Sequence, residues 1–476
     1  VAALSVVVFY RASRLKFSPR VALLTTIAFG FATSTWSTSA RALWQHGPAN
    51  LMLVTGFYLL LRAARRSAPG SLLISLFLAG LCFGLLPSVR PTSALFTIAA
   101  LVYVVYHYRL RALGFIAGFI AYLPALVWNV YHFGRLSGGY GNMFGQAPYQ
   151  LTLPHFLITA LAHLVSPSRG LLLISPVLLL FIPGLRRLRR SPTEPPADRW
   201  LIYALLLAAL GIFIQYSFYT VWWAGWSPGT RFMTDLLVPL AYLINYALAG
   251  FGETQAGWRS LGFPWFPSLL GVSLLVQVAL VMGATGWQWD PLPIDVNLYP
   301  QRVWHLQDSQ VVRCLKSLAI PLRGSQRRSP AYLAQLRGTI DQVTVLPYSA
   351  EVNPFRDFPD RSSALHAGDL VYVRAQLTNR GDQPWFGVHS ALIGGETRVR
   401  ARLTGRGALE PEHQLLVLAD RVPAGQSTVA IGLVNLPEAS GTYRLTLDLV
   451  LEEIADFPDL DGSSHGVNLV VQNAGT

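Results

Sequence analysis

Long apolar runs separated by short charged connections dominate the first 284 residues of this chain. A helix needs about 20 apolar residues to cross a bilayer. Only 13% of the 476 residues are charged, against about 25% in an ordinary soluble domain. We therefore expect a multi-pass bundle of transmembrane helices rather than a soluble helical protein. The apolar runs lie at residues 21–36, 49–62, 71–88, 92–107, 112–130, 170–186, 200–219, 233–251 and 262–284, with a half-length run at 1–10.

The basic residues fall into alternate connections between these runs. Connections rich in arginine and lysine stay in the cytoplasm, so the connections that carry a single arginine are expected on the outer face. Residues 1–284 hold 20 Lys and Arg but only four Asp and Glu. This surplus of positive charge then reflects membrane topology, and we expect no nucleic-acid partner. The basic set holds Arg11, Arg14, Lys16, Arg20, Arg62, Arg65, Arg66, Arg109, Arg111, Arg186, Arg187, Arg189, Arg190, Arg199 and Arg259, and the arginine-poor set holds Arg41, Arg90, Arg135, Arg169 and Arg231.

The composition changes after residue 284. Residues 285–342 mix proline, tryptophan and charge with short amphipathic pieces, which predicts an extracytoplasmic linker with one or two short helices. In residues 343–476 apolar and polar residues alternate between turn residues, which predicts an antiparallel, Ig-like β-sandwich of seven or eight strands. The "RGD" at 380–382 is either an adhesion signal or a hairpin turn, and the turn is favoured. Cys82 and Cys314 indicate neither a disulfide nor a thiolate metal site.

A tryptophan-rich connection at 219–235 is unusual for a chain that otherwise joins its apolar runs with basic residues. Trp222, Trp223 and Trp226 lie there beside Gly225, Pro228 and Gly229. Tryptophans favour the membrane interface, and this preference would explain one isolated tryptophan in the connection. Three of them among helix-breaking residues instead predict a re-entrant bend, and we expect the three tryptophans to form the wall of an outward cavity.

Arginines of the arginine-poor connections are the candidates for binding a phosphate group. Guanidinium groups bind phosphate oxygens well, so Arg90, Arg169 and Arg231 could hold the phosphate of a lipid-linked substrate. Their alternative role is to anchor helix ends at the lipid headgroups. Arg231 also lies four residues before Asp235, one helical turn away, so the two residues could pair.

His46 and Tyr140 are two further polar residues expected on the outer face. Either could contact a substrate, although a single histidine at a helix end is also a common structural cap. The sequence contains no metal-ligand spacing, no nucleotide-binding glycine loop and no Gly-x-Ser-x-Gly elbow. We therefore expect neither a metal nor a soluble cofactor.

Five stretches occur in a familiar order: "RALWQHGPANLMLVTGFYLLLR", "LLPSVRPTSALF", "FGRLSGGYG", "VSPSRGLLLISPVLLL" and "VWWAGWSPGTRFMTDLLVPL". Together, across residues 1–285, they resemble bacterial glycosyltransferases of the GT-C fold that use polyprenyl-phosphate sugar donors. The branch is related to protein O-mannosyltransferases and to lipid A aminoarabinose transferase. The tail resembles the Ig-like domain that some of these enzymes carry.

The resemblance implies an inverting hexosyl or pentosyl transfer on the outer face of the bacterial cytoplasmic membrane. The lipid-linked sugar is then the donor and the acceptor is unknown. In such enzymes an acidic residue in the first outward loop activates the acceptor hydroxyl. That loop and the span before it would lie upstream of Val1, so we expect the chain as given to be inactive.

Two other functions fit the same sequence features. A transporter or flippase of lipid-linked sugars would be built from two related halves, but the sequence shows no internal repeat. A cell-envelope interaction protein would instead use the sandwich domain as its binding part.

Overall fold

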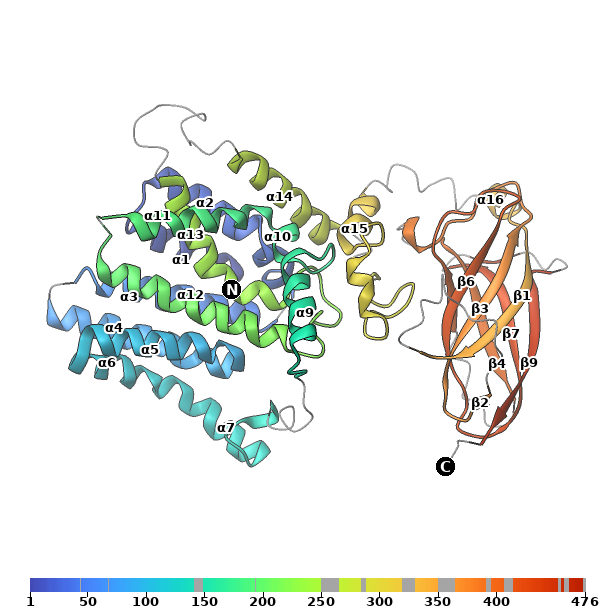
Figure 1. Ribbon diagram of the computed structural model, residues 1–476, viewed down its shortest axis with the longest axis horizontal. Helices are drawn as coiled ribbons and strands as arrows, with labels where there is room; N and C mark the ends of the chain where they lie inside the picture. The colour runs from blue at the N-terminus through green and yellow to red at the C-terminus, as the bar shows by residue number, and fades with distance from the viewer. Residues whose placement is uncertain are drawn as a thin grey trace. The chain divides into compact units, whose positions relative to one another are not determined.

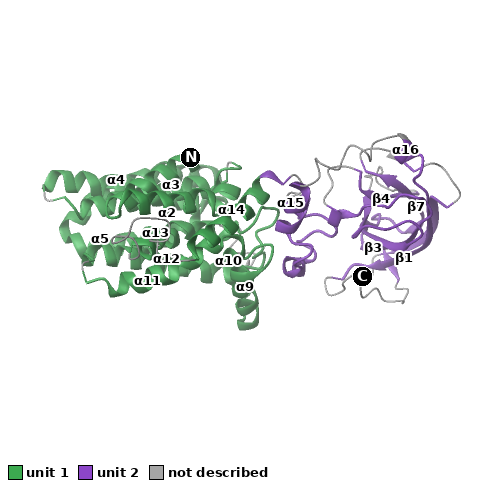
Figure 2. Ribbon diagram, turned by 90° about the horizontal axis from the view of Figure 1, so that it is seen from above, with its two compact units in different colours: residues 1–281 green, residues 282–476 purple. Residues whose placement is uncertain are grey.

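The structure is a computed structural model in which the chain folds as two compact units, residues 1–281 and 282–476 (Figure 2). Each unit is described by itself. The structure describes residues 1–42, 44–66, 68–140, 149–192, 194–249, 265–283, 288–318, 330–349, 364–390, 395–405, 414–452, 455–457 and 462–473.

In the part of unit 1 that the structure describes, the secondary structure is helical apart from an isolated β-bridge between Tyr149 and Tyr219, and helices occupy every predicted apolar run (Figure 1). The sequence missed one helix, α9, which lies in a stretch predicted as a loop. The helices are α1 (Ala2–Arg14), α2 (Pro19–Phe31), α3 (His46–Ala63), α4 (Pro69–Val89), α5 (Ala94–Tyr108), α6 (Ala112–Ala117), α7 (Leu123–Phe133), α9 (Leu153–Val165), α10 (Leu171–Ile174), α11 (Phe181–Arg190), α12 (Pro196–Ser217), α13 (Leu237–Ala249) and α14 (Phe266–Met282).

Among the described residues of unit 1, four helical segments are long and apolar enough to cross a membrane. They are Pro69–Val89, Pro91–Phe133, Pro196–Ser217 and Phe232–Ala249. In the last segment 83% of the residues are buried, and it forms the centre of the bundle, whereas only 17% of an apolar 18-residue stretch within Pro91–Phe133 is buried, at the periphery. Exposed apolar side chains cover that periphery, among them Val102 and Val127. A water-soluble fold would bury such side chains, so unit 1 is suited to a lipid environment.

A close backbone contact joins α4 to the short 3₁₀ helix η4 (Gly118–Tyr122) that follows α6. A Cβ atom on Gly80 would overlap the carbonyl oxygen of Phe115, and one on Gly118 would overlap the backbone of Gly80. Only glycine allows the two helices to approach this closely.

Polar contacts in unit 1 gather at the two ends of α12. Near its start, Asp198 pairs with Arg65 at 2.6 Å, and Glu194 pairs with Lys16. These partners come from the basic connections. Near its end lies Tyr216, which contacts residues from the arginine-poor connections. Asp198 and Tyr216 are separated by about 27 Å of helix, from the rise per residue. The two sets of connections therefore gather at opposite ends of the unit.

Unit 2 contains the short helices α15 (Gln310–Leu318) and α16 (Pro330–Leu333) and an all-β domain. The predicted all-β fold is confirmed. The strands are β1 (Gly338–Pro347), β2 (Leu365–His366), β3 (Leu370–Asn379), β4 (Thr397–Thr404), β5 (Gln414–Leu418), β6 (Ser427–Asn435), β7 (Gly441–Leu451), β8 (Ala455–Asp456) and β9 (Ser464–Gln472).

The strands form one curved sheet rather than the two separate sheets of the predicted sandwich (Figure 1). Their order is β1-β3-β6-β5-β4-β7-β9-β2, with β8 paired to β7, and only the β2–β9 pair is parallel. The sheet is continuous because β5 hydrogen-bonds to both β4 and β6, and so joins the strands β1, β3 and β6 to the strands β4, β7, β9 and β2. A bond of 2.8 Å from the Ile340 amide to the Gly462 carbonyl brings β1 close to the β9 end of the sheet. The first strand begins at Gly338, five residues before the predicted start.

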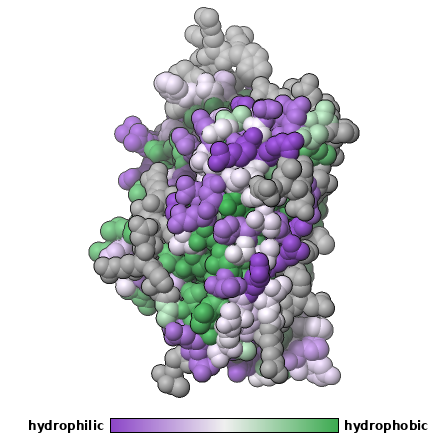
Figure 3. Space-filling model, turned by 90° about the vertical axis from the view of Figure 1, so that its right-hand side faces the viewer, coloured by the Kyte–Doolittle hydropathy of each residue, from purple (hydrophilic) through white to green (hydrophobic). Residues whose placement is uncertain are grey.

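Alternate side chains of the strands face a shared core inside the curved sheet. Trp385, Val399 and Leu445 are fully buried there. On the face seen in Figure 3, hydrophilic and near-neutral residues surround a central hydrophobic patch, and smaller hydrophobic areas lie near the edges. This polar exterior differs from the apolar periphery of unit 1 and is suited to water.

Candidate functional site

The arginine-poor connections of unit 1 meet at one end of the bundle. Thr38 bonds to the carbonyl of Pro228 at 3.5 Å, and Arg41 donates to the carbonyl of Leu280 at 2.8 Å. The connections before α3, after α4 and before α13 are joined around the carboxylate of Asp235. We describe this group of contacts as the outer cluster, made of Trp44, His46, Arg90, Tyr216, Arg231 and Asp235.

Asp235 is the centre of the outer cluster and is almost completely buried. Its Oδ1 lies 2.9 Å from His46 Nδ1, and its Oδ2 lies 2.6 Å from Arg90 Nε. Arg90 Nη1 lies 3.1 Å from the other ring nitrogen, His46 Nε2. Arginine can only donate, so His46 Nε2 accepts and the ring proton sits on Nδ1, which donates to Asp235. The arrangement is therefore that of a neutral His46 between a carboxylate and a guanidinium.

Arg90 is positioned by the sequence around it. Pro91 disfavours a helical conformation for the residue before it, and Arg90 is extended at φ −152° and ψ 109°, where α4 ends. Its Nη2 donates to the hydroxyl of Tyr216, which also lies 3.2 Å from the Thr92 hydroxyl. Arg90 is only 5% exposed. Its side chain is therefore held inside the protein and does not reach lipid headgroups.

Arg169 organises the tryptophan-rich loop. Its guanidinium donates to the carbonyls of Gly225 and Gly229, both at 3.2 Å, and of Ser227. The loop bends sharply, with left-handed conformations at Ala224, Gly225 and Gly229. Because Arg169 is 2% exposed and bonds to three carbonyls, we interpret it as a clamp on this loop. Its predicted contact with a lipid phosphate stays a prediction.

The three tryptophans of the loop occupy different environments. Trp222 and Trp223 are buried and meet edge to face with ring centres 6.0 Å apart, and Trp222 also packs on His163 at 5.7 Å. Trp226 is 55% exposed. Their predicted role as a cavity wall stays a prediction. The bend that the sequence predicted is present, since the backbone of Trp226 lies between two left-handed glycines.

Among the described residues, Arg231 makes fewer hydrogen bonds through its guanidinium group than Arg90 and Arg169 do. Its plane lies over the ring of Trp44 at 4.1 Å from the ring centre, and Nη1 donates a long bond of 3.4 Å to the carbonyl of Ala224. Its Nε has no hydrogen-bond partner among the described residues. Arg231 is therefore the arginine of the outer cluster that can still donate to a ligand.

The predicted pairing of Arg231 with Asp235 is wrong. Asp235 pairs with His46 and Arg90 instead. The prediction assumed an α-helix, in which residues four apart share a face. Phe232–Leu236 is a 3₁₀ helix, η7, with about three residues per turn, so residues four apart point in different directions.

The structure brings His46, Arg90 and Arg231 together, and it gives Arg169 a separate position under the loop. Tyr140 ends the short helix η5 (Gly138–Tyr140), and its side chain lies outside the described residues. The sequence missed Trp44, Tyr216 and the central role of Asp235. No local signal could have found them, since Asp235 meets a histidine 189 positions away. Within the described ranges, no group of three His, Cys, Asp or Glu could hold a metal ion.

Comparisons with known proteins found similarity only at the level of structure. No family model matches the chain, and no curated protein matches it in sequence. It is similar to the crystal structure of ArnT from Cupriavidus metallidurans bound to undecaprenyl phosphate, with 16% identity and a TM-score of 0.39 over 67% of this chain. It is also similar to the arabinosyltransferase EmbB from Mycobacterium smegmatis, with 12% identity and a TM-score of 0.38 over 99% of this chain. The chain covers 56% of each of these two proteins.

Proposed function

We propose that this chain forms the membrane core of a glycosyltransferase that moves a sugar from a polyprenyl-phosphate carrier to an acceptor on the extracytoplasmic face. The observation that carries the proposal is the charge of the outer cluster and its loop. Three guanidinium groups, of Arg90, Arg169 and Arg231, lie in or beside the outer cluster, whose one carboxylate, Asp235, is paired with Arg90, and His46 is neutral. A low-dielectric site with an excess of guanidinium groups favours an anionic ligand.

Arg231 is the residue that we expect to contact the phosphate. Its guanidinium makes a single long hydrogen bond to the protein, so N–H groups remain to donate, and the ring of Trp44 packs against the group. A guanidinium held in a fixed plane binds two phosphate oxygens at once. The exposed Trp226 lies in the same loop, which suits a ligand that enters from the lipid surface.

Arg90 contributes its charge rather than a direct contact. Asp235, His46 and Tyr216 hold its guanidinium before any ligand arrives. A charge that is fixed in advance stabilises a developing negative charge without reorganising during the reaction. Both ring nitrogens of His46 are occupied in this arrangement, so His46 positions Arg90 and does not accept a proton from the acceptor.

The proposed reaction is a single displacement at the anomeric carbon. The bond from this carbon to the carrier phosphate oxygen breaks, and a bond to the acceptor oxygen forms with inversion. The electron pair leaves with the phosphate, where the arginines stabilise its charge. The acceptor proton goes to a base, for which the resemblance implies a carboxylate in an outward loop. Asp235 does not fit this role because Arg90 and His46 already occupy its oxygens.

The test separates binding from turnover. Purified chain in detergent micelles is mixed with a radiolabelled polyprenyl phosphate, and the dissociation constant is measured with and without Arg231→Ala. We expect the variant to bind about tenfold more weakly, from the loss of one charged hydrogen bond. Arg135→Ala, at an exposed arginine expected on the same face, is the matched control and should change nothing.

Two results would overturn the proposal. The first is equal binding of the lipid phosphate and of the same polyprenol without a phosphate. The second is unchanged binding in Arg231→Ala, which would return Arg231 to a structural role. Transfer of a labelled sugar from polyprenyl phosphate is measured in the same micelles, and the configuration of the product tests inversion.

A further inference from the structure

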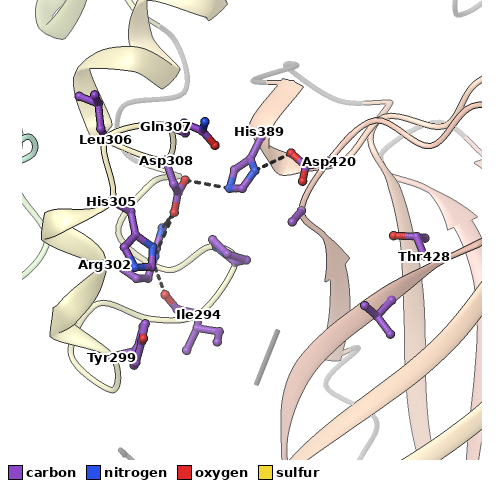
Figure 4. Close-up of a pocket in the computed structure, with 13 residues that line it drawn as sticks. Ile294, Tyr299, Arg302, His305, Leu306, Gln307, Asp308, His389, Asp420 and Thr428 are labelled. Atoms are coloured by element: carbon purple, nitrogen blue, oxygen red, sulfur yellow. Dashed lines mark hydrogen bonds and ion pairs between the residues drawn. The ribbon is translucent and has the colours of Figure 1, made fainter. Parts of the chain in front are cut away.

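A cavity of about 690 Å³ in unit 2 lies between residues 288–318 and the β-sheet (Figure 4). One side is formed by the segment that contains Tyr299, Arg302 and Asp308, and the other side by the segments around His389 and Asp420. The two sides are far apart in the sequence and are held together by few contacts. Any movement of residues 288–318 relative to the β-sheet would therefore have to break some of these few contacts.

An apolar cluster joins the two sides at one edge of the cavity. Ile294 and Tyr299 pack there on Tyr372 of β3 and Ile431 of β6. The hydroxyl of Tyr348 also donates to the carbonyl of Leu298 at 2.8 Å. Apolar packing of this kind does not depend on pH. This edge therefore stays closed when titratable groups change their charge.

Ionic contacts join the two sides at another part of the cavity (Figure 4). His389 lies between two carboxylates, with Nδ1 3.0 Å from Asp420 Oδ1 and Nε2 3.3 Å from Asp308 Oδ1. Asp308 is fixed on its own side by Arg302 at 3.2 Å and by Arg313. The histidine ring is therefore the bridge between a fixed buried carboxylate and an exposed one.

The position of the His389 ring between two carboxylates favours one protonation state of the ring over the other. A neutral imidazole carries one N–H and can donate to only one carboxylate, so its other nitrogen would turn a lone pair toward the second. An imidazolium carries two N–H groups and can face both carboxylates favourably. In unit 2 a carboxylate lies near each ring nitrogen, hydrogen-bonded to Nδ1 and at ion-pair distance from Nε2, and this surrounding charge favours a protonated ring.

We propose that His389 is a pH-sensitive latch in unit 2, which holds residues 288–318 against the β-sheet when its ring is protonated and releases them when it is neutral. This inference does not depend on the proposed transferase function. Histidine side chains change charge between about pH 5 and 8. The apolar cluster then acts as the hinge, and the cavity widens when the latch opens.

Other charged groups surround the His389 ring and affect how strongly the latch holds. Lys316 of α15 donates to the carbonyl of His389 at 2.9 Å, an exposed contact that is too weak to hold residues 288–318 in place without the ionic bridge. Asp420 is 82% exposed, so its pairing is screened by water and salt. The charged and titratable groups that face this region are Asp308 with Arg302 and Arg313, Lys316, Asp420 with the neighbouring Arg421, and His305 on the cavity wall.

Hydrogen exchange of the full chain in detergent micelles tests the latch. Protection of backbone amides in residues 300–318 is compared at about pH 5.5 and pH 8, with exchange times scaled for the intrinsic effect of pH. We expect about two- to fivefold higher protection at the lower pH, from the strength of partly exposed ion pairs. His389→Gln should remove this difference. Asp420→Asn, at an exposed position that folding does not require, should reduce it.

A second histidine supplies the matched control. His366 of β2 lies 3.5 Å from Asp369 but faces only one carboxylate, so His366→Gln should leave the pH difference in residues 300–318 intact. The proposal is overturned if the wild-type chain shows equal protection at both pH values. It is also overturned if His389→Gln keeps the difference, or if His366→Gln removes it.

Discussion

Replacing Asp235 by Asn should destabilise unit 1 by about 3 kcal/mol, and the structure shows why. Asp235 accepts hydrogen bonds from two donors, His46 Nδ1 and Arg90 Nε. An Asn side chain has one carbonyl oxygen, so its amide group would face one of these donors. Losing one charged hydrogen bond costs about 1.5–3 kcal/mol, and breaking a buried ion pair costs about 3–5 kcal/mol. Because Asn keeps one bond, we expect the lower part of that range.

Thermal unfolding in detergent measures this cost through a double-mutant cycle. The three variants are Asp235→Asn, Arg90→Gln and the two together. The double variant removes both charges of the Asp235–Arg90 pair and leaves neither of them buried without a partner, so it should lose less stability than the two single variants added together, with a coupling of about 2 kcal/mol. Asp198→Asn is the comparison, since its partner Arg65 is 31% exposed. Water can solvate Arg65, so this loss should be smaller.

The reasoning would be refuted by additive losses in the cycle. It would be refuted equally by an Asp235→Asn variant whose stability lies within about 0.5 kcal/mol of the wild type, the range of ordinary surface substitutions. Either result would mean that Arg90 finds water or another partner when the carboxylate is gone.

Two further predictions concern pH and helix packing. Burial of the Asp308 carboxyl would raise its pKa, but Arg313 and Arg302 outweigh burial and hold the pKa well below its usual range. The resulting stabilisation is present above about pH 4 and is lost as the pH falls further, so the melting temperature of unit 2 should drop in acid, and Asp308→Asn should flatten that drop. Gly80→Ala should destabilise unit 1 by about 1–3 kcal/mol in thermal unfolding, because the added methyl group would overlap the carbonyl oxygen of Phe115 in α6. Gly70→Ala in the same helix meets open space and should be neutral, and equal losses in the two variants would contradict the close-packing explanation.

The sequence predicted the helices well because apolar runs of membrane length have few alternatives. It missed α9, since Leu153–Val165 has only 13 residues and is too short to read as a span. It predicted a bend at the tryptophan-rich loop from the glycines and proline. The role of Arg169 as a clamp on that bend was not readable, because its three acceptors are backbone carbonyls that any residue type could provide.

The centre of the candidate site illustrates a different limit. The i, i+4 rule placed Arg231 beside Asp235, but the rule holds only in an α-helix and the segment is a 3₁₀ helix. The residues that do meet Asp235 come from the start of α3 and the end of α4. Such contacts follow from how whole helices pack, and no local pattern specifies them. In unit 2 the strand pattern was readable, whereas the pairing of β5 with both neighbours was not.

The burial of Asp235 has a consequence for the biogenesis of the protein. Phe232–Ala249 is the most buried of the four apolar segments, and it begins with a carboxylate that would be costly to place alone in lipid. His46 and Arg90 precede it in the chain, so both partners have already left the ribosome when this segment is made. Its stable integration therefore waits for the earlier helices, and a chain that inserted them wrongly would leave this segment without its counter-charge and open to quality-control proteolysis.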